Sequence, residues 1–307
     1  MRIIFNVQRV GLSNNGGSGT IIKTANCLSQ IGNEVIISGD HPNKNTWVPL
    51  DNGVRYIHSP NIPKSDFIIA TGYYSVRSTI TSPIKNKFYY IRGFENWITS
   101  EDRLVQSYKQ LKCIVNSEWL KNFLSKNGIK SNLIYPGIDD KIFFDKNSNR
   151  DIEIGGLYNK KHKTKRHNDI IEVSNKMKKS FKLLGLDISN PDPKTLNDFY
   201  NSIKVWYSPT ELEGLHNCPM EASLSGCGIV VNDHERNGMS DYCIDGNTAL
   251  VYKSRDLDEA MSKIELLLND DLLRAKLKNN MNSLLIKKIG KRKDNALIFN
   301  SVLRGKR

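Results

Sequence analysis

Two carboxylates, Glu213 and Glu221, stand with seven residues between them in the stretch 208–228, where they could bind hydroxyl groups of a ligand. The apolar run 203–207 before them predicts a short buried strand. Asn217, four residues after Glu213, can cap a helix that begins directly after it. Because the first N–H groups of a helix are unpaired and lie at the positive end of its dipole, this loop is also a predicted phosphate site.

The residues around the two carboxylates follow a strand–loop–helix–strand pattern. Pro219 is tolerated in the first turn of the predicted helix, where its missing N–H would have no partner. Gly226 is typical of a helix end, and the run 229–231 predicts the next buried strand. The alternative interpretation is an ordinary βαβ unit that carries two surface carboxylates.

A dense basic run, 159–167, follows a predicted strand at 152–158 and precedes a predicted helix at 169–178. Lys165 and Arg166 stand just ahead of that helix. A leaving nucleoside diphosphate gains negative charge, and both cations and a helix N-terminus stabilise such charge. We therefore interpret the run as phosphate-binding, and the alternative is a solvated basic loop.

A glycine-rich segment lies near the start of the chain, between a predicted strand at 3–7 and a predicted helix at 21–30. It contains Gly16, Gly17 and Ser18. A glycine-rich turn between a strand and a helix allows the backbone to approach an anion closely. The alternative is a flexible turn without a ligand.

Arg92 and Glu95 follow the predicted strand 88–91. Charged groups just past the carboxyl end of a strand lie where open α/β sheets bind ligands. The alternative is a surface Arg–Glu pair beside a packed Trp97.

Length and composition limit the possible classes of protein. The 307 residues are enough for two domains, and no run of 18 apolar residues predicts a membrane span. The first residues read as a strand, not as a signal peptide. Five cysteines without metal-ligand spacing indicate reduced thiols in a cytosol-like compartment and no structural zinc. The net charge of +13 favours a polyanionic partner, namely nucleic acid, anionic lipid or a phosphorylated substrate, although a solvated basic surface is the alternative.

The Glu213-to-Glu221 spacing, with Gly214 after the first Glu and Ala222 after the second, resembles the donor-site signature of the retaining glycosyltransferases of family 4. The family pattern is E-G-F-G-L-x-x-x-E-A, and Leu215-His216-Asn217 here replace its middle. A second segment, 132–143 with Pro136, Gly137, Asp139 and Phe143, resembles the pattern that closes the N-terminal domain of that family.

The resemblance implies an α/β protein of the GT-B fold, with two Rossmann-like domains facing across a cleft. We expect an acceptor-binding domain at 1–146 and a donor-binding domain at 147–290, joined through a polar linker at 144–151. The final helix, in 291–307, is expected to pack back on the first domain.

The resemblance also implies roles for residues. Glu213 would bind the donor sugar, Glu221 the ribose, and Lys165 with Arg166 the diphosphate, so Glu213, Lys165 and Arg166 are the expected catalytic set. Leu157 stands where the family has Arg, and we expect Arg166, Lys160 or Lys161 to replace it. Asp241 or Ser240 stands where the family has the Glu of a segment whose backbone N–H groups meet the donor. Arg92 with Glu95 occupies the acceptor side, where the family often has His. The full expected donor-binding set is Gly16, Gly17, Ser18, Gly156, Lys165, Arg166, Glu213, Gly214, Leu215, His216, Asn217 and Glu221.

The implied activity is sugar transfer from a nucleotide-sugar donor with retention, without a metal or other cofactor and without an obligate protein partner. A glycan or lipid-linked glycan is the expected acceptor. One alternative is a phage-type DNA glycosyltransferase acting on a hydroxylated base, which the basic charge would suit. Another is a non-catalytic sugar-nucleotide or glycan-binding protein of the same fold. We expect a cytoplasmic protein, with peripheral attachment to an anionic membrane surface as a further alternative.

Overall fold

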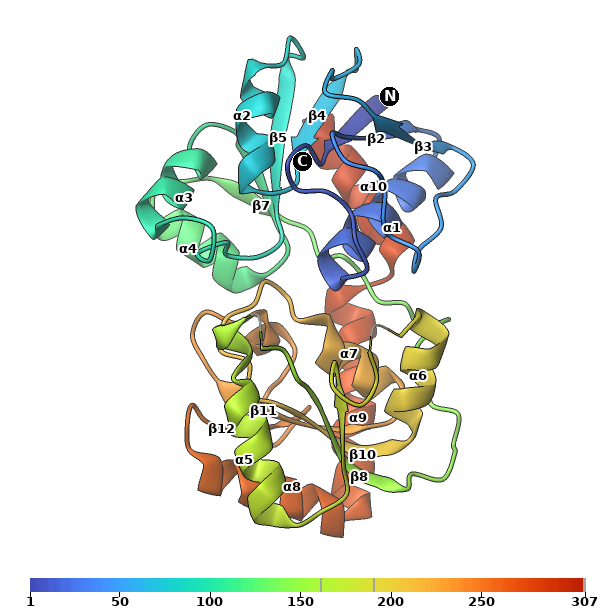
Figure 1. The fold of residues 1–307 in the computed structure, drawn as a ribbon, viewed down its shortest axis with the longest axis vertical. Coiled ribbons are helices and arrows are strands. Elements are labelled where there is room, and N and C mark those ends of the chain that lie inside the picture. The colour runs from blue at the N-terminus through green and yellow to red at the C-terminus, as the bar shows by residue number, and fades with distance from the viewer. Residues whose placement is uncertain (161, 190, 306–307) are drawn as a thin grey trace. The chain divides into compact units, whose positions relative to one another are not determined.

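The chain folds into two compact units in a computed structural model that describes residues 1–160, 162–189 and 191–305. Unit 1 comprises Met1–Gly137 and Lys291–Arg307, and unit 2 comprises Ile138–Gly290. Each unit is built on its own parallel sheet with helices against it (Figure 1). The boundary expected after residue 146 therefore falls after residue 137.

Unit 1 contains a seven-stranded parallel sheet of order β3-β2-β1-β4-β5-β6-β7. The chain builds outward from β1 in one direction and then returns to continue from its other side, so β1 and β4 flank the point where the strand order reverses. Ligands of open α/β sheets bind at the carboxyl ends of the strands beside such a point. The strands are β1 (Arg2–Asn6), β2 (Glu34–Gly39), β3 (Val54–His58), β4 (Phe67–Ala70), β5 (Asn86–Ile91), β6 (Lys112–Val115) and β7 (Ser131–Leu133).

Among the residues that the structure describes, five α-helices belong to unit 1, and the last of them lies at 292–303. Helix α10 lies beside α1, as the red and blue ribbons of Figure 1 show. The helices are α1 (Gly16–Gln30), α2 (Tyr73–Thr81), α3 (Glu101–Tyr108), α4 (Glu118–Lys126) and α10 (Arg292–Leu303).

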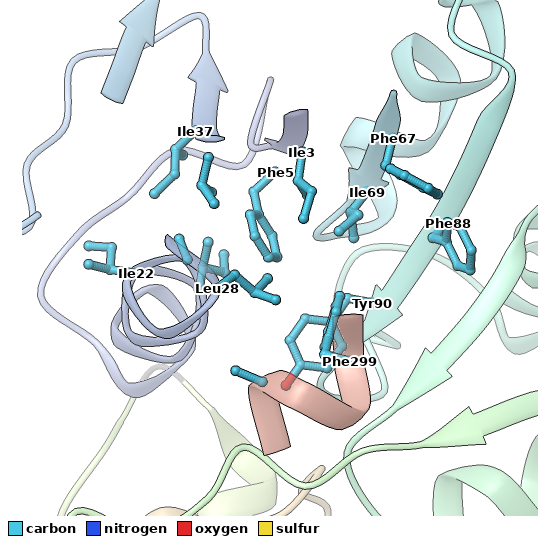
Figure 2. Packing of buried hydrophobic residues seen from close by; sticks show 14 of the residues in the cluster. Ile3, Phe5, Ile22, Leu28, Ile37, Phe67, Ile69, Phe88, Tyr90 and Phe299 are labelled. Carbon is cyan, nitrogen blue, oxygen red and sulfur yellow. The ribbon is translucent and has the colours of Figure 1, made fainter. Parts of the chain in front are cut away.

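Alternate residues of β1 are buried on opposite faces of the sheet. Ile3 and Phe5 belong to the larger core, whereas Ile4 belongs to a smaller cluster. Phe299 of α10 joins the larger core, with its ring centroid 6.2 Å from that of Phe5 and 5.4 Å from that of Tyr90 (Figure 2). Burial of such a ring stabilises a fold by about 2–3 kcal/mol, so the C-terminal helix is an integral part of unit 1.

Helix α1 begins five residues earlier than its apolar spacing predicts. Asn15 caps it, because the Asn15 side chain accepts a hydrogen bond of 2.8 Å from the Ser18 N–H. Gly16, Gly17 and Ser18 therefore form the first helical turn and not a glycine-rich loop. Glycine is a poor helix former, which is why composition placed the helix start too late.

Unit 2 contains a five-stranded parallel sheet of order β12-β11-β10-β8-β9. Its strand order reverses between β8 and β10, so the loops after these two strands flank a ligand-binding edge. The strands are β8 (Ile152–Leu157), β9 (Phe181–Leu184), β10 (Ile203–Ser208), β11 (Gly228–Asp233) and β12 (Leu250–Lys253).

The helices of unit 2 cover both faces of its sheet. Val205 and Tyr207 of β10 join the core beneath α5 and α8, and the intervening Trp206 packs against Tyr200 of α6, with ring centroids 5.2 Å apart. The helix at 271–284 continues directly as a π-helical turn at 285–289. No helix within the described ranges is long and apolar enough to cross a membrane. The helices are α5 (His167–Met177), α6 (Pro193–Asn201), α7 (Asn217–Leu224), α8 (Leu257–Asn269), α9 (Asp271–Leu284), the 3-10 turns η1 (Lys163–Lys165) and η2 (Gly238–Asp241), and η3 (Leu285–Ile289).

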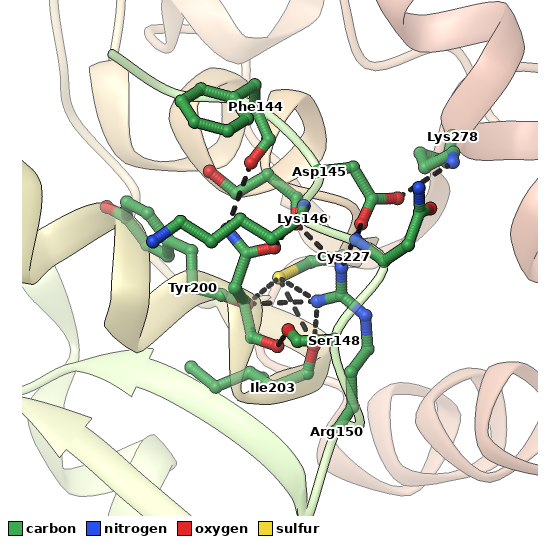
Figure 3. A network of polar contacts seen from close by, with 12 residues as sticks. Phe144, Asp145, Lys146, Ser148, Arg150, Tyr200, Ile203, Cys227 and Lys278 are labelled. Atoms are coloured by element: carbon green, nitrogen blue, oxygen red, sulfur yellow. Dashed lines mark hydrogen bonds and ion pairs between the residues drawn. The ribbon is translucent and has the colours of Figure 1, made fainter.

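Residues 144–151 are anchored to unit 2 and do not form the polar linker that their composition predicts. The Arg150 guanidinium donates to the carbonyls of Tyr200, Ile203 and Ser225 and to the Asp145 carboxylate, at 2.7–3.0 Å (Figure 3). Polar composition predicted solvent exposure, but one planar guanidinium satisfies four acceptors here.

Candidate functional site

The candidate site lies in unit 2, where the loops after β8 and β10 meet at the reversal of strand order. The first loop carries Lys165 and Arg166 into α5, and the second carries Glu213 into α7. The Glu211 N–H donates a hydrogen bond of 2.8 Å to the Thr164 carbonyl and joins the two loops. Two segments separated by about 50 residues thus form one surface.

Lys165 and Glu213 form an ion pair across these two loops, from the Lys165 Nζ to the Glu213 Oε1. Their side chains are 13% and 26% exposed, so both remain accessible while being partly withdrawn from water. Burial lowers the pKa of the Lys165 ammonium to about 8, while the nearby Cys218 raises it. The Glu213 carboxylate also favours the charged form, and Lys165 is therefore cationic at neutral pH.

Arg166 adopts a left-handed backbone conformation, with φ of 53° and ψ of 42°. The left-handed region costs a non-glycine residue about 1–2 kcal/mol, so glycine would adopt this conformation more easily than Arg166 does. The Arg166 side chain pairs with Asp169 through Nε, at 2.9 Å, and Nη2, at 2.8 Å. The expected diphosphate contact of Arg166 thus competes with a two-point ion pair at the start of α5.

Lys160 and Lys161 of the basic run are the other expected replacements for the family's Arg. The Lys160 Nζ is 5.6 Å from the centre of the Tyr158 ring, in a cation–π arrangement. Lys161, the other expected replacement for the family's Arg, lies outside the described residues. Lys165 is therefore the cation that the structure places against Glu213.

The backbone of the Glu213 loop is held by the segment that leads into η2. The Gly238 N–H donates to the Glu213 carbonyl at 3.3 Å, and the Gly214 carbonyl lies so close to Gly238 that a Cβ on Gly238 would clash with it. The Asn237 side chain adds a hydrogen bond of 2.6 Å to the Thr210 carbonyl. Asn237 and Gly238 are therefore supports of the site that sequence analysis missed, because their role depends on contacts between distant segments.

Helix α7 begins at Asn217, and His216 is its N-cap residue without a side-chain cap hydrogen bond. The expectation that Asn217 itself caps the helix is therefore wrong by one residue. Leu215, the residue before His216, is buried. Burial, together with the charge of Lys165, holds the pKa of His216 well below its usual range. His216 is thus neutral, and it adds no charge to the site.

Glu221 lies on α7, beyond the first turn. Its Oε2 accepts a hydrogen bond of 3.4 Å from the Tyr200 hydroxyl of α6. Burial raises the pKa of the neighbouring Cys218 thiol to about 11, so this thiol is protonated at neutral pH. Cys218 is therefore uncharged, and Glu221 is the charged side chain of this pair on α7.

Gly156 stands in β8, below the site. A Cβ at this position would lie 3.2 Å from the Tyr207 carbonyl of the neighbouring strand. Gly156 thus serves strand packing. At η2, Asp241 is buried and Ser240 is exposed.

The expected acceptor-side residues lie in unit 1, together with the glycine-rich segment. The Arg92 Nη1 donates to the Gly17 carbonyl at 2.5 Å, and its Nη2 donates to the Thr71 carbonyl at 2.5 Å. A Cβ on Gly17 would lie 3.0 Å from Nη1. Arg92 therefore ties the first turn of α1 to the loop after β4.

Glu95 accepts hydrogen bonds from the Tyr73 N–H, at 2.8 Å, and from the Tyr89 hydroxyl, at 2.9 Å. It thus caps α2, and burial raises the pKa of its carboxyl. Trp97 is 59% exposed, whereas the alternative interpretation of this segment predicted a packed side chain. Arg92 and Glu95 both fix backbone at the carboxyl edge of the unit 1 sheet.

Across residues 1–160, 162–189 and 191–305, no three His, Cys, Asp or Glu side chains lie close enough together to hold a metal ion. At the unit 2 site, the Lys165 ammonium and the N-terminus of α7 can both stabilise negative charge. These groups suit an anionic phosphate.

Comparison with known proteins identifies the fold. No family model matches the sequence. The capsular polysaccharide biosynthesis glycosyltransferase CapM of Staphylococcus aureus is 30% identical over 82 residues, which are 27% of this chain and 21% of that protein. The match thus spans about a fifth of that relative's length.

Two solved structures match nearly the whole chain. Sucrose-phosphate synthase of Thermosynechococcus elongatus is similar over 99% of this chain and 98% of its own, with a TM-score of 0.81 and 14% identity. The HepE protein of Anabaena, in complex with UDP and glucose, is similar over 99% of this chain and 100% of its own, with a TM-score of 0.77 and 12% identity. The chain has the GT-B fold of glycosyltransferases, with two Rossmann-like domains.

Proposed function

We propose that this protein is a retaining glycosyltransferase that transfers a sugar from a nucleotide-sugar donor to a hydroxyl group. The observation that carries the proposal is the pairing of Lys165 with Glu213 where the strand order of unit 2 reverses. There, a cation that can bind a diphosphate lies next to a carboxylate that can bind sugar hydroxyls, at the start of a helix. The local match to CapM, a capsular polysaccharide glycosyltransferase, supports the same class.

Donor binding would replace the Lys165–Glu213 ion pair with contacts to the donor. Its diphosphate takes the place of Glu213 beside the Lys165 ammonium, and the N–H groups at the start of α7 add their dipole. Glu213, released from Lys165, accepts hydrogen bonds from the sugar hydroxyls. Glu221, further along α7, accepts a hydrogen bond from the ribose.

In the reaction, the bond between the anomeric carbon and the diphosphate oxygen breaks, and its electron pair stays on the phosphate. Lys165 stabilises the charge that develops on this leaving group. The acceptor oxygen forms its bond to the anomeric carbon on the same face, and its proton passes to the leaving phosphate. Glu213 and Glu221 belong to one short segment and do not form the opposed acid and base pair of a glycosidase.

We propose that no metal takes part, because the fixed ammonium of Lys165 supplies positive charge to the leaving group. A uridine diphosphate sugar is the first donor to test, since HepE is observed with UDP and glucose. A glycan is the proposed acceptor. The net charge of +13 favours DNA as the second candidate.

The test is release of UDP, GDP, dTDP or ADP from the corresponding sugar nucleotides. Neutral glycosides and duplex DNA containing 5-hydroxymethylcytosine are supplied as acceptors, and NMR of the product reads the anomeric configuration. We expect turnover with one donor and a retained configuration. Lys165→Met should lower kcat/KM at least about tenfold, since it removes a charge-assisted contact. Lys163→Met, an exposed lysine of the same 3-10 turn, is the matched control.

Three outcomes would count against this account. An inverted product contradicts the same-face mechanism. Transfer to DNA alone replaces the glycan acceptor with the second candidate. Tight donor binding without any turnover favours a sugar-nucleotide-binding protein of the same fold.

A further inference from the structure

Large apolar side chains are exposed at the carboxyl edge of the unit 1 sheet. Val10 follows β1, Tyr74 lies in the first turn of α2 after β4, and Trp97 follows β5. Their exposed fractions are 38%, 42% and 59%. Exposed apolar groups that gather at one place mark an interaction site, and this edge is where open α/β sheets bind ligands.

Several contacts join these loops to one another. The Arg9 guanidinium carbon lies 5.3 Å from the centre of the Tyr74 ring. Gly72 is enclosed between the next loops, because a Cβ there would lie 3.1 Å from both the Val10 Cγ2 and the Glu95 Oε1. Together with the backbone contacts of Arg92, these contacts hold Val10 and Tyr74 on a rigid support.

The charges of these loops do not suit a polyanion. Segment 7–15 has Arg9 as its one charged residue, and segment 71–75 has none. In segment 92–98, Arg92 and Glu95 are both engaged with backbone groups. Duplex DNA requires several phosphate contacts, and one exposed arginine does not supply them. The polar groups that do lie here are amides and hydroxyls, such as Ser13, Asn15 and Asn96.

We propose that Arg9, Val10, Tyr74 and Trp97, here named the Tyr74 platform, bind a pyranose ring of a neutral glycan acceptor. An aromatic face covers the apolar C–H face of such a ring, and the surrounding amides and hydroxyls pair with its hydroxyl groups. The inference rests on the proposed function for its statement that the bound glycan is the acceptor. It assigns Arg92 and Glu95 to positioning the platform, not to contacting the glycan.

The test measures sugar binding by the 307-residue chain without relying on turnover. Saturation-transfer NMR is recorded with methyl pyranosides of glucose, galactose, mannose and N-acetylglucosamine. We expect a signal on ring C–H protons with at least one of them. Tyr74→Ala and Trp97→Ala should each weaken binding about five- to tenfold, whereas Tyr74→Phe keeps the ring and should keep binding. Leu297→Ala removes an equally exposed apolar side chain on α10 and should change nothing.

UDP binding, measured in the same samples, separates this inference from the proposed function. If UDP binds but no methyl pyranoside does, the platform is wrong and the donor site stands. If pyranosides bind through the platform but UDP does not, the proposed function fails while the glycan site remains. A pyranoside signal that is lost in Glu213→Gln and kept in Tyr74→Ala belongs to the donor site and overturns the inference. Loss of duplex DNA binding in Tyr74→Ala, with unchanged pyranoside binding, also overturns it.

Discussion

The Lys165 ammonium contacts the Glu213 carboxylate across two loops of unit 2 that are far apart in the sequence. Each group would carry an unbalanced charge in a partly buried position without the other, which is costly. The pair thus keeps both charges in place before a ligand arrives. A nucleotide sugar offers a phosphate to Lys165 and hydroxyls to Glu213, so it can give each of these residues a new partner.

The first prediction concerns pH. Because burial places the pKa of Lys165 at about 8, its charge is present below that pH and is lost as the pH rises through it. The affinity for a UDP-sugar, whose diphosphate does not titrate in this range, should therefore be constant between about pH 6 and 7 and should fall about tenfold per unit above pH 8. Isothermal titration across pH 6–9.5 measures this. Lys165→Arg, which stays charged, should show a flat profile, and an equal fall in that variant would contradict the assignment.

A second prediction compares two residues in the left-handed region, Arg166 and Lys178, both with φ of 53°. Lys178 is exposed at the C-terminal end of α5, so Lys178→Gly should stabilise the protein by about 0.5–1 kcal/mol. Arg166→Gly gains the same relief but loses the ion pair with Asp169, and its net effect should be smaller. Urea unfolding measures both. A larger stabilisation by Arg166→Gly would show that the ion pair contributes nothing.

A third prediction concerns the Arg150 network of Figure 3. Arg150→Met should destabilise unit 2 by about 2–4 kcal/mol, because it leaves three carbonyls and the Asp145 carboxylate without this donor. Lys146→Met breaks the exposed ion pair with Asp198 and should cost less than about 1 kcal/mol. Thermal melting compares the two variants, and similar losses would mean that 144–151 behaves as a loose linker.

Sequence patterns predicted the strands well because short apolar runs bounded by turns become buried parallel strands. They failed for α2 and α3, which the sequence analysis did not identify. Helix α2 is rich in Tyr, Ser and Thr, which are weak helix formers, and its N-terminus is completed by Glu95 from another loop. Such a long-range cap leaves no local signal.

The candidate site was predicted in part. The positions of Lys165 and Glu213 came from a resemblance in motif, but their contact follows from the order of strands in the folded sheet. The support by Gly238 and the two-carbonyl contact of Arg92 had no signal in the sequence, since a single arginine or glycine is compatible with many environments. Physical contacts between distant segments are what the sequence alone does not reveal.

The most direct test of the donor site is a calorimetric titration with UDP-, GDP-, dTDP- and ADP-sugars. It compares the wild type with Lys165→Met, Glu221→Ala and the control Lys163→Met. We predict that one nucleotide sugar binds, that Lys165→Met and Glu221→Ala each weaken it about ten- to hundredfold, and that Lys163→Met leaves it unchanged. If Lys165→Met and Glu221→Ala bound the nucleotide sugar as strongly as the wild type does, that result would contradict the account. It would also be contradicted if the wild type bound no nucleotide sugar.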